Sequence, residues 1–425
     1  MTGPLPPYAA GQARVAFSVL QEADETVREG MPADTFLRKL FHQHRNFGSR
    51  DRRFVSQLIF SWFRWRGWLA QISNEPTPAT AAAAYLLDVT ESLPAIDHLL
   101  LECRTNGIAV AGQPMGALRP SEKAEALAGC FPGHTFTWKT LVPAWVLDTF
   151  PPGHDPEALV LSFQQRPPTW LRCRDTDEII ASLNRQQIPW DRHARMQSAL
   201  AIDPSWHLAH VLKREAGRYE VQDIASQAVG MLCSPEPGQR WWDACAGSGG
   251  KTLHLAELLD GHGAVLATDV RDLSREFERR VAAAGYRGIS AIQLDAATTS
   301  PQPAPFDGIL VDAPCSGMGT WSRNPDARWR TKPEDILAQS MQQEAILANA
   351  GACLNVGGIL VYSVCTLTDR ETTGVVHTFL ERHPEISLDP FSNPLTGEAV
   401  PGILQLLPAD GPGDGMFIAR FRKNR

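Results

Sequence analysis

Several features of common protein classes are missing from this chain of 425 residues. No run approaches the roughly 18 apolar residues of a membrane-spanning helix. The N-terminal segment MTGPLPPYAAGQARVAF has no basic stretch followed by a long apolar core, so it does not resemble a secretory signal peptide. The eight cysteines form no CxxC pair, and a disulfide framework is not expected. These absences favour a cytoplasmic protein with reduced cysteines and no membrane partner.

An excess of positive charge is also missing. The formal net charge of −7 argues against a nucleic-acid partner, because phosphate contact relies on Lys and Arg. The charge is unevenly distributed, however, and the segment 37–69 opposes the single acid Asp51 with eight basic residues: Arg38, Lys39, Arg45, Arg50, Arg52, Arg53, Arg64 and Arg66. This segment is either a solvated helix face or an RNA-binding surface, and its Phe and Trp residues are expected mainly in the core.

The length and the residue pattern predict three domains. Residues 1–135 repeat apolar side chains at three- and four-residue spacing, which predicts an all-helical domain. Prolines then mark a connecting region, and residues 136–225 are expected to form a linker and a small α+β domain, with a strand at TWLRCR and an Asp-capped helix at DTDEIIASLNRQ. Residues 226–425 alternate strands and helices up to the strand GGILVYSVC. That alternation predicts a Rossmann-like α/β domain with a parallel sheet covered on both faces.

Ligands of such sheets bind beyond the carboxyl ends of the strands. The strand RWWDACA runs directly into the glycine-rich turn AGSGGKT. A phosphate-binding P-loop is the rival interpretation, but Cys245 stands where that motif needs its first glycine. Asp269 ends the next strand, 26 residues after Asp243, where an acid can accept hydrogen bonds from both ribose hydroxyls of an adenosine-type cofactor. Asp295 ends the following strand and is similarly placed for the adenine amino group.

Two cysteines and an acid mark a second group of strand ends. One strand ends in Asp312-Ala313-Pro314-Cys315, and the next ends in Cys365. If these strands are neighbours, both sulfurs lie at the edge that carries the glycine-rich turn. A thiolate that adds to carbon 6 of cytosine, while another group bonds or protonates N3, makes carbon 5 able to attack a sulfonium methyl group. Asp312 is the candidate partner of N3, and the spacing leaves open which cysteine is the nucleophile.

The segments DACAGSGGKT, DAPCSGMGTWSRNPDARWR and VYSVCTLTDRE closely resemble three motifs of the RNA cytosine-5 methyltransferases of the Sun family. The resemblance covers roughly the last 200 residues. It implies that Cys365 is the nucleophile, that Cys315 assists breakdown of the covalent product complex, and that Asp312 is the acid near N3. One departure is Val364, where the family usually has Thr before the nucleophile; Thr366 is the residue that can compensate.

The same resemblance implies S-adenosylmethionine as the cofactor. The residues expected to bind it are Asp243, Cys245, Ala246, Gly247, Ser248, Gly249, Gly250, Lys251, Asp269, Arg271, Asp295, Ala296 and Asp312.

The N-terminal segment HRNFGSRDRRFVSQLIFSWFRWRGWL resembles the NusB-like helical domain found in ribosomal RNA methyltransferases of this kind. This implies ribosomal RNA, of the 16S type, as the substrate, with the middle segment QDIASQ helping to form an RNA groove. The RNA-binding candidates are Arg50, Arg52, Arg53, Arg323 and Arg328, and Trp321 and Trp329 are further candidates for stacking on bases. No metal is expected, because His207 and His210 lack a suitably spaced Cys or carboxylate. We expect a monomer.

Two other functions stay open at this point. The chain could be a non-enzymatic RNA-binding or ribosome-assembly factor that keeps the cofactor fold as a scaffold. It could also be an NTPase, which the missing first glycine of the P-loop argues against.

Overall fold

The computed structural model describes residues 5–108, 110, 112–273 and 275–425. The chain divides into two compact units, the first made of Met1–Gln165 with Trp321–Thr331 and the second of Arg166–Thr320 with Lys332–Arg425. A short segment that follows the strand ending at Asp312 therefore belongs to the first unit. No helix among the described residues combines the length and the apolar character that crossing a bilayer requires.

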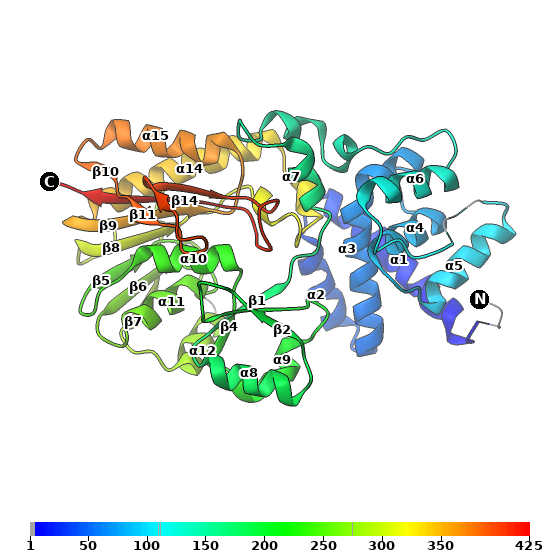
Figure 1. The fold of residues 1–425 in the computed structure, drawn as a ribbon, viewed down its shortest axis with the longest axis horizontal. Coiled ribbons are helices and arrows are strands. Elements are labelled where there is room, and N and C mark those ends of the chain that lie inside the picture. The colour runs from blue at the N-terminus through cyan, green and yellow to red at the C-terminus, as the bar shows by residue number, and fades with distance from the viewer. Residues whose placement is uncertain (1–4, 109, 111, 274) are drawn as a thin grey trace. The chain divides into compact units, whose positions relative to one another are not determined.

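The first unit is helical, as expected for the N-terminal segment (Figure 1). The long helix α3 packs against α1 and α4, and buries Trp62, Trp65 and Trp68. Prolines stand at the first positions of α4, α5 and α6, where a missing N–H costs no hydrogen bond. The helices of this unit are α1 (Tyr8–Arg28), α2 (Ala33–Gln43), α3 (Ser49–Ile72), α4 (Pro78–Asp88), α5 (Pro94–Thr105), α6 (Pro120–Cys130), η1 (Trp138–Leu141), η2 (Ala144–Asp148), α7 (Pro156–Ser162) and α13 (Ala327–Arg330).

The second unit begins with a small antiparallel sheet of order β2-β3-β1-β4. The strand and the helix predicted there are present, and the Asp175 side chain caps α8 by accepting a hydrogen bond from the Glu178 N–H. The division into three domains remains a prediction. This sheet lies within residues 136–225, the predicted linker and small α+β domain. The elements are β1 (Thr169–Cys173), α8 (Thr176–Arg185), β2 (Trp190–Arg192), β3 (Ala199–Ile202), α9 (Leu208–Val211), η3 (Lys213–Glu215) and β4 (Tyr219–Val221).

The rest of the second unit is built on an eight-stranded sheet of order β10-β14-β9-β8-β5-β6-β7, with β13 paired to β14. The neighbours from β9 to β7 are parallel, which confirms the predicted Rossmann-like fold. Its elements are α10 (Ile224–Cys233), β5 (Arg240–Asp243), α11 (Gly250–Leu258), β6 (Ala264–Asp269), α12 (Arg275–Ala284), β7 (Ile289–Gln293), β8 (Phe306–Asp312), η4 (Met318–Thr320), α14 (Pro333–Ala352), β9 (Leu354–Val364), η5 (Asp369–Glu371), α15 (Thr373–Arg382), β10 (Ile386–Leu388), β13 (Ile403–Leu406) and β14 (Met416–Lys423), with a separate pair β11 (Phe391–Ser392) and β12 (Ala399–Val400).

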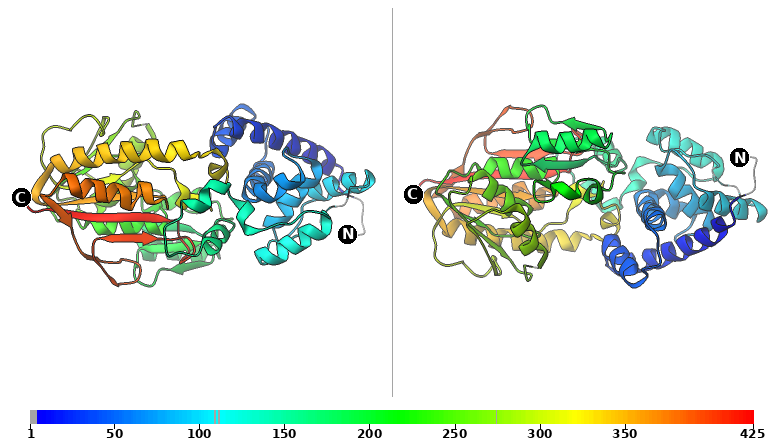
Figure 2. Two further views of the ribbon diagram at one scale, coloured as in Figure 1. Left: turned by 90° about the horizontal axis from the view of Figure 1, so that it is seen from above. Right: turned by 90° about the horizontal axis from the view of Figure 1, so that it is seen from below.

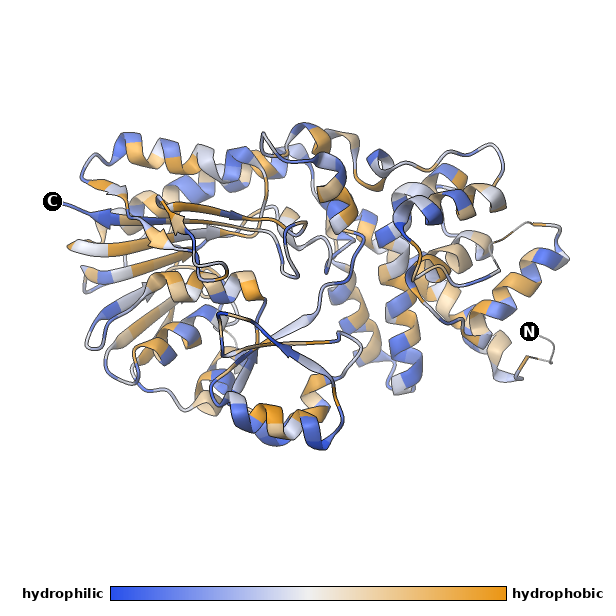
Figure 3. Ribbon diagram, in the orientation of Figure 1, coloured by the Kyte–Doolittle hydropathy of each residue, from blue (hydrophilic) through white to orange (hydrophobic). Residues whose placement is uncertain are grey.

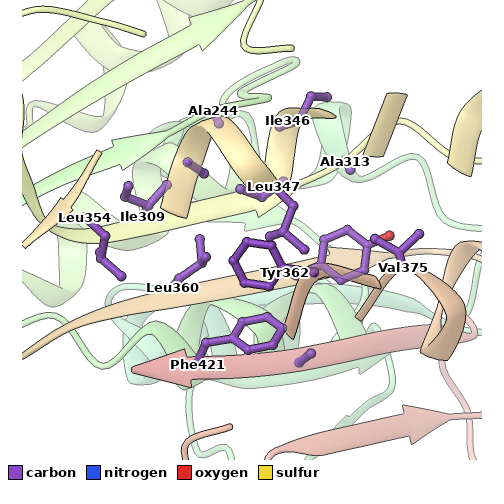
Figure 4. Packing of buried hydrophobic residues seen from close by; sticks show 14 of the residues in the cluster. Ala244, Ile309, Ala313, Ile346, Leu347, Leu354, Leu360, Tyr362, Val375 and Phe421 are labelled. Carbon is purple, nitrogen blue, oxygen red and sulfur yellow. The ribbon is translucent and has the colours of Figure 1, made fainter. Parts of the chain in front are cut away.

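Helices cover both faces of this sheet. Because successive side chains of a strand point to opposite faces, Trp241 joins the core under α10 and α11, whereas Trp242 joins the core under α14 and α15. The second core also contains Leu347, Tyr362 and Phe421 (Figure 4). Helices α14 and α15 lie side by side along the strands (Figure 2). In Figure 3 the central strands are mostly apolar, and these helices have both apolar and polar residues. This is expected because the strands are buried between two layers, whereas each helix has one side toward the sheet and one toward solvent.

The C-terminal strands lie outside the sequence-based expectation. No strand is predicted after GGILVYSVC, yet β14 runs antiparallel to β9 on the side away from β8. Strands β10 and β13 both pair with β14. Strand β9, which leads to Cys365, is therefore hydrogen-bonded on both sides, to β8 and to β14.

Gly308 in β8 offers a test of how tightly this sheet is packed. A methyl group at Gly308 would lie 2.2 Å from the ring of Trp241, its partner on β5. We predict that Gly308→Ala lowers the free energy of unfolding by about 1–3 kcal/mol, because the indole must move within a close-packed core. Chemical denaturation measures the change. Gly411→Ala, at an exposed position with nothing within 4 Å of the added carbon, should be near neutral; equal effects of both substitutions would contradict the explanation.

Candidate active site

The glycine-rich turn joins β5 to α11 in a conformation that requires glycine. Gly249 has φ +88°, and an added Cβ would lie 2.6 Å from the Phe277 ring. Gly247 has φ +56°, also in the left-handed region that favours glycine. The turn thus leads the backbone from Asp243, at the end of β5, into the first residues of α11. Backbone N–H groups at such a turn are suited to bind an anionic or polar cofactor group.

Asp269 faces this turn from the end of β6. Its carboxylate accepts hydrogen bonds from the Gly247 N–H at 2.8 Å and from the Arg271 guanidinium at 2.8 and 3.0 Å. Burial alone would raise the pKa of Asp269, but these hydrogen bonds lower it below its ordinary value. The Arg271 side chain is 73% exposed and can move away. The carboxylate is therefore a charged acceptor beside the glycine turn, as the predicted ribose contact of an adenosine-type cofactor would need.

The other predicted cofactor residues lie at the same edge of the sheet. Asp295 follows β7 and accepts a hydrogen bond from the Ala297 N–H, while Ala296 is buried. Asp243 accepts a hydrogen bond from the Thr252 hydroxyl at 2.6 Å, and burial raises the pKa of this carboxyl to about 7. The glycine turn and the acids at three strand ends form one cradle, and they fit an adenosine-type cofactor.

The two cysteines lie together. Strands β8 and β9 are parallel neighbours with Asp312 opposite Ser363, so both chains leave the sheet at the same edge. The Sγ atoms of Cys315 and Cys365 are 3.4 Å apart, within hydrogen-bond distance for sulfur. The hydrogen bond with Cys365 and burial together raise the pKa of Cys315 well above its ordinary value. Cys315 therefore retains its proton at neutral pH and can donate it to the other sulfur.

A charged pair lies at the same strand ends. Lys251 Nζ, from the first turn of α11, is 2.6 Å from Asp312 Oδ2. The Ser363 hydroxyl donates to the other carboxylate oxygen, Oδ1, at 2.8 Å. Burial alone would lower the pKa of Lys251, but Asp312 raises it above the ordinary value. An ammonium group, a carboxylate and two thiols are thus gathered at the ends of β8 and β9 and the start of α11.

Thr366 and Val364, on either side of Cys365, have different surroundings. The Val364 side chain is fully buried in the core beneath α14 and α15. The Thr366 hydroxyl is within 2.7 Å of the Ser316 hydroxyl, so the residues that follow the two cysteines are bonded to each other. Sequence reasoning did not identify Ser316, Ser363 or Glu371 as functional residues, although each lies next to or inside one of the recognised motifs.

The predicted RNA-binding arginines fall into different environments. Arg50 and Arg53 are exposed on α3, whereas Arg52 is half-buried and donates to the Phe47 carbonyl at 3.0 Å. Arg323 is also half-buried. Two other basic residues of the same segment are paired within the first unit, Arg64 with Asp88 and Arg66 with Asp24.

The expectation that Arg328 and Trp321 contact RNA does not agree with their burial. Both are 0% exposed. The Arg328 guanidinium donates to the carbonyls of Leu141, Phe163 and Trp321, all within the first unit. Trp329 is half-buried, and its indole N–H donates to the Phe63 carbonyl at 2.7 Å. The physical reason is that the segment after the cysteine loop is part of the helical core, which sequence spacing does not reveal.

The segment QDIASQ is also largely internal. Gln222 and Gln227 are buried, and Gln222 accepts a hydrogen bond from Arg172 at 2.9 Å. Asp223 caps α10 by accepting from the Ala225 N–H. Within the part of the chain that the structure describes, no group of three or more His, Cys, Asp or Glu side chains is arranged to hold a metal ion.

The thiol pair makes a pH-dependent prediction. In Cys365→Ala, loss of the sulfur partner should lower the pKa of Cys315 toward its ordinary value. Alkylation of Cys315 by iodoacetamide, followed by peptide mass spectrometry, should then reach its half-maximal rate at a lower pH than in the wild type. An unchanged or upward-shifted profile would show that the two sulfurs do not interact in solution.

Comparison with known proteins places the chain in a family. A family model described as 16S rRNA methyltransferase RsmB/F matches residues 230–422. The ribosomal RNA small subunit methyltransferase B of Cronobacter sakazakii is 29% identical over 431 residues, which cover 95% of this chain and 97% of that one. Across the first relatives, the match spans between 48% and 97% of the relative's own length.

Solved structures share the fold. The crystal structure of NSun6 from Pyrococcus horikoshii with SFG has a TM-score of 0.56 and 18% identity, and it covers 63% of this chain and 94% of that chain.

The ribosomal RNA small subunit methyltransferase B of Citrobacter koseri is 32% identical over 319 residues, which cover 72% of each chain. With this similarity over nearly three quarters of both sequences, the protein belongs to the RsmB/F family of 16S rRNA methyltransferases.

Proposed function

We propose that the protein methylates carbon 5 of a cytosine in 16S ribosomal RNA, with S-adenosylmethionine as methyl donor and a covalent bond between Cys365 and carbon 6 of the base. The observation that carries the proposal is the pair of sulfur atoms 3.4 Å apart at adjoining strand ends, beside the Lys251–Asp312 pair. The names of the relatives support ribosomal RNA as the substrate class. We place the reaction in the cytoplasm.

The bound cofactor would supply an electrophilic methyl group on a sulfonium centre. On the protein side, the Cys365 thiolate adds to carbon 6 and the electron pair of the 5,6 double bond moves toward carbon 5. A protonated Cys315 that donates to Cys365 Sγ favours the negative charge on Cys365 rather than on itself. After methylation, a base removes the proton from carbon 5, the double bond re-forms and Cys365 leaves as a thiolate.

Asp312 and Lys251 act together in this scheme. Cytosine N3 is an acceptor, and an ionised carboxylate has no proton to donate. A carboxyl group bonds N3 as a donor only in its protonated form, and the charged Lys251 ammonium, with Nζ 2.6 Å from Oδ2, holds the Asp312 side chain in place. The hydroxyl of Ser363 on the other oxygen fixes the orientation of the carboxyl group.

We extend the proposal to the first unit, which we expect to adopt a NusB-like fold and to contact RNA. Arg50 and Arg53 support this, because both are exposed and lie about one helical turn apart on α3. Unpaired or looped RNA is the expected target, since a base must be accessible for attack on carbon 6.

The roles of the two cysteines give the central test. Cys365→Ser should abolish transfer of labelled methyl groups to unmodified 16S ribosomal RNA. Cys315→Ser should instead accumulate a protein–RNA adduct that survives denaturing electrophoresis, because breakdown of the covalent complex is blocked. Cys130→Ser, a substitution on α6, is the control and should retain activity. Normal turnover by Cys365→Ser would exclude this nucleophile, and tight RNA binding by a wild type without any transfer would favour an assembly factor.

Asp269 gives a separate test of the cofactor site. Asp269→Asn should weaken S-adenosylmethionine binding by about tenfold or more in titration calorimetry, because a hydrogen bond to a charged acceptor contributes roughly 1.5–3 kcal/mol. Asp272→Asn changes an exposed acid three residues along the chain and should leave affinity unchanged. Equal affinity of the Asp269→Asn variant and the wild type would show that the cofactor lies elsewhere.

A further inference from the structure

Glu371 is a fully buried carboxylate close to the two cysteine loops. It ends η5, and its exposed fraction is 0%. Its Oε1 accepts from the Ser316 N–H at 2.8 Å and from the Gln343 amide at 3.2 Å. Its Oε2 accepts from three hydroxyls, those of Ser316 at 2.5 Å, Thr368 at 2.8 Å and Thr366 at 3.2 Å.

The donors come from both loops. Ser316 directly follows Cys315, and Thr366 directly follows Cys365. One carboxylate is thus within hydrogen-bond distance of the neighbour of each cysteine. The two hydroxyls are also 2.7 Å apart, so the single hydroxyl proton of Thr366 can be donated either to Glu371 or to Ser316. A backbone bond from the Gly319 N–H to the Cys365 carbonyl, at 3.0 Å, joins the loops a second time.

The surroundings of Glu371 are fixed as well. Gln343, on α14, donates to the Pro314 carbonyl at 2.8 Å as well as to Glu371. The Tyr362 hydroxyl, from β9, donates to the Glu371 backbone carbonyl at 2.7 Å. The side chain of Glu371 is thereby held by a helix, through Gln343, and its backbone by a central strand of the sheet, through Tyr362.

The chemistry of these contacts points to a positioning role. Each of the five donors is electrically neutral, and a buried carboxylate costs free energy that neutral donors only partly offset. A carboxylate is also acceptor-only, with two oxygens that together accept about four hydrogen bonds, so it suits a point where several donors converge. An amide or an apolar side chain of the same size would leave some of these donors without an acceptor.

We propose that Glu371 is a positioning residue that bridges the Cys315 and Cys365 loops and so sets the spacing of the two sulfurs. This inference rests on the proposed function, since the spacing matters for a reaction in which the two cysteines act in sequence. Glu371 does not touch either sulfur and acts through Ser316 and Thr366.

Two substitutions separate the reach of this side chain from its acceptor capacity. Glu371→Asp keeps the carboxylate but shortens it by one carbon, so it cannot bond both loops at once. Glu371→Gln keeps the shape but replaces one acceptor oxygen with a donor. We expect kcat for RNA methylation to fall by about a hundredfold in the Asp variant and about tenfold in the Gln variant, with the KM for RNA changed less than about twofold. Glu381→Gln, at an exposed position on α15, is the matched control and should behave as wild type.

Hydrogen exchange of the ligand-free protein tests the bridge without RNA. Amides of the peptides 314–320 and 365–368 should exchange faster in Glu371→Asp than in the wild type and the Glu381→Gln control. Thermal unfolding of each variant checks that the fold is retained, and the isosteric Gln variant is informative if the Asp variant unfolds. If kcat of both variants stays within about twofold of wild type, or if exchange of both loops is unchanged, the proposal is overturned. A wild type that transfers no methyl group while the Asp variant shows faster exchange would instead refute the proposed function and leave the bridge standing.

Discussion

The pairing of β8 with β9 is the constraint on which the candidate site depends. These parallel neighbours are in register up to Asp312 opposite Ser363, and each then continues into a loop that carries a cysteine. Parallel strands end at the same edge of a sheet, so the fold itself brings residues 50 positions apart to a sulfur–sulfur distance of 3.4 Å. A single-residue shift in this register would turn the side chains at the strand ends to the opposite face. The antiparallel strand β14 opposes such a shift, because it pairs with β9 on the side away from β8.

Around this pair of strands, Lys251 and Cys315 each keep a proton that the proposed chemistry uses. Lys251 is mostly buried, but its contact with Asp312 raises its pKa and keeps it charged. The raised pKa of Cys315 keeps that sulfur protonated. Within a partly desolvated site these interactions are stronger than in water, and their geometry is set before a substrate arrives. The loops need a further restraint for the same reason, because a displacement of about 1 Å in such a site can cost a large part of the rate.

The sequence predicted the catalytic fold well where local patterns decide structure. The alternation of apolar strands with amphipathic helices predicted the order from β5 to β9, and the glycine turn and strand-terminal acids predicted the edge where the site lies. The strand β14 was missed, because residues 383–425 contain no strand–helix alternation and its partner is far away in sequence. The burial of Arg328 was also missed: a basic residue in a motif is expected at the surface, but here three backbone carbonyls converge on its guanidinium. Such convergence depends on tertiary structure and leaves no local signal. Thr366 lies between these cases, since the sequence suggested that it compensates for Val364 but did not show that its partner is Ser316.

The two cysteines cannot perform their proposed roles independently. When two ionisable groups lie within hydrogen-bond distance, loss of the first proton makes loss of the second harder, and the pair titrates as one system. Glu371 contributes to the raised pKa of the Cys315 thiol, and the sulfur of Cys365 interacts electrostatically with Lys251. Both interactions are compatible with a Cys315 thiol that keeps its proton in the proposed scheme. The charges around the pair agree with the proposed assignment of Cys365 as the nucleophile, which rests on its position in the motif.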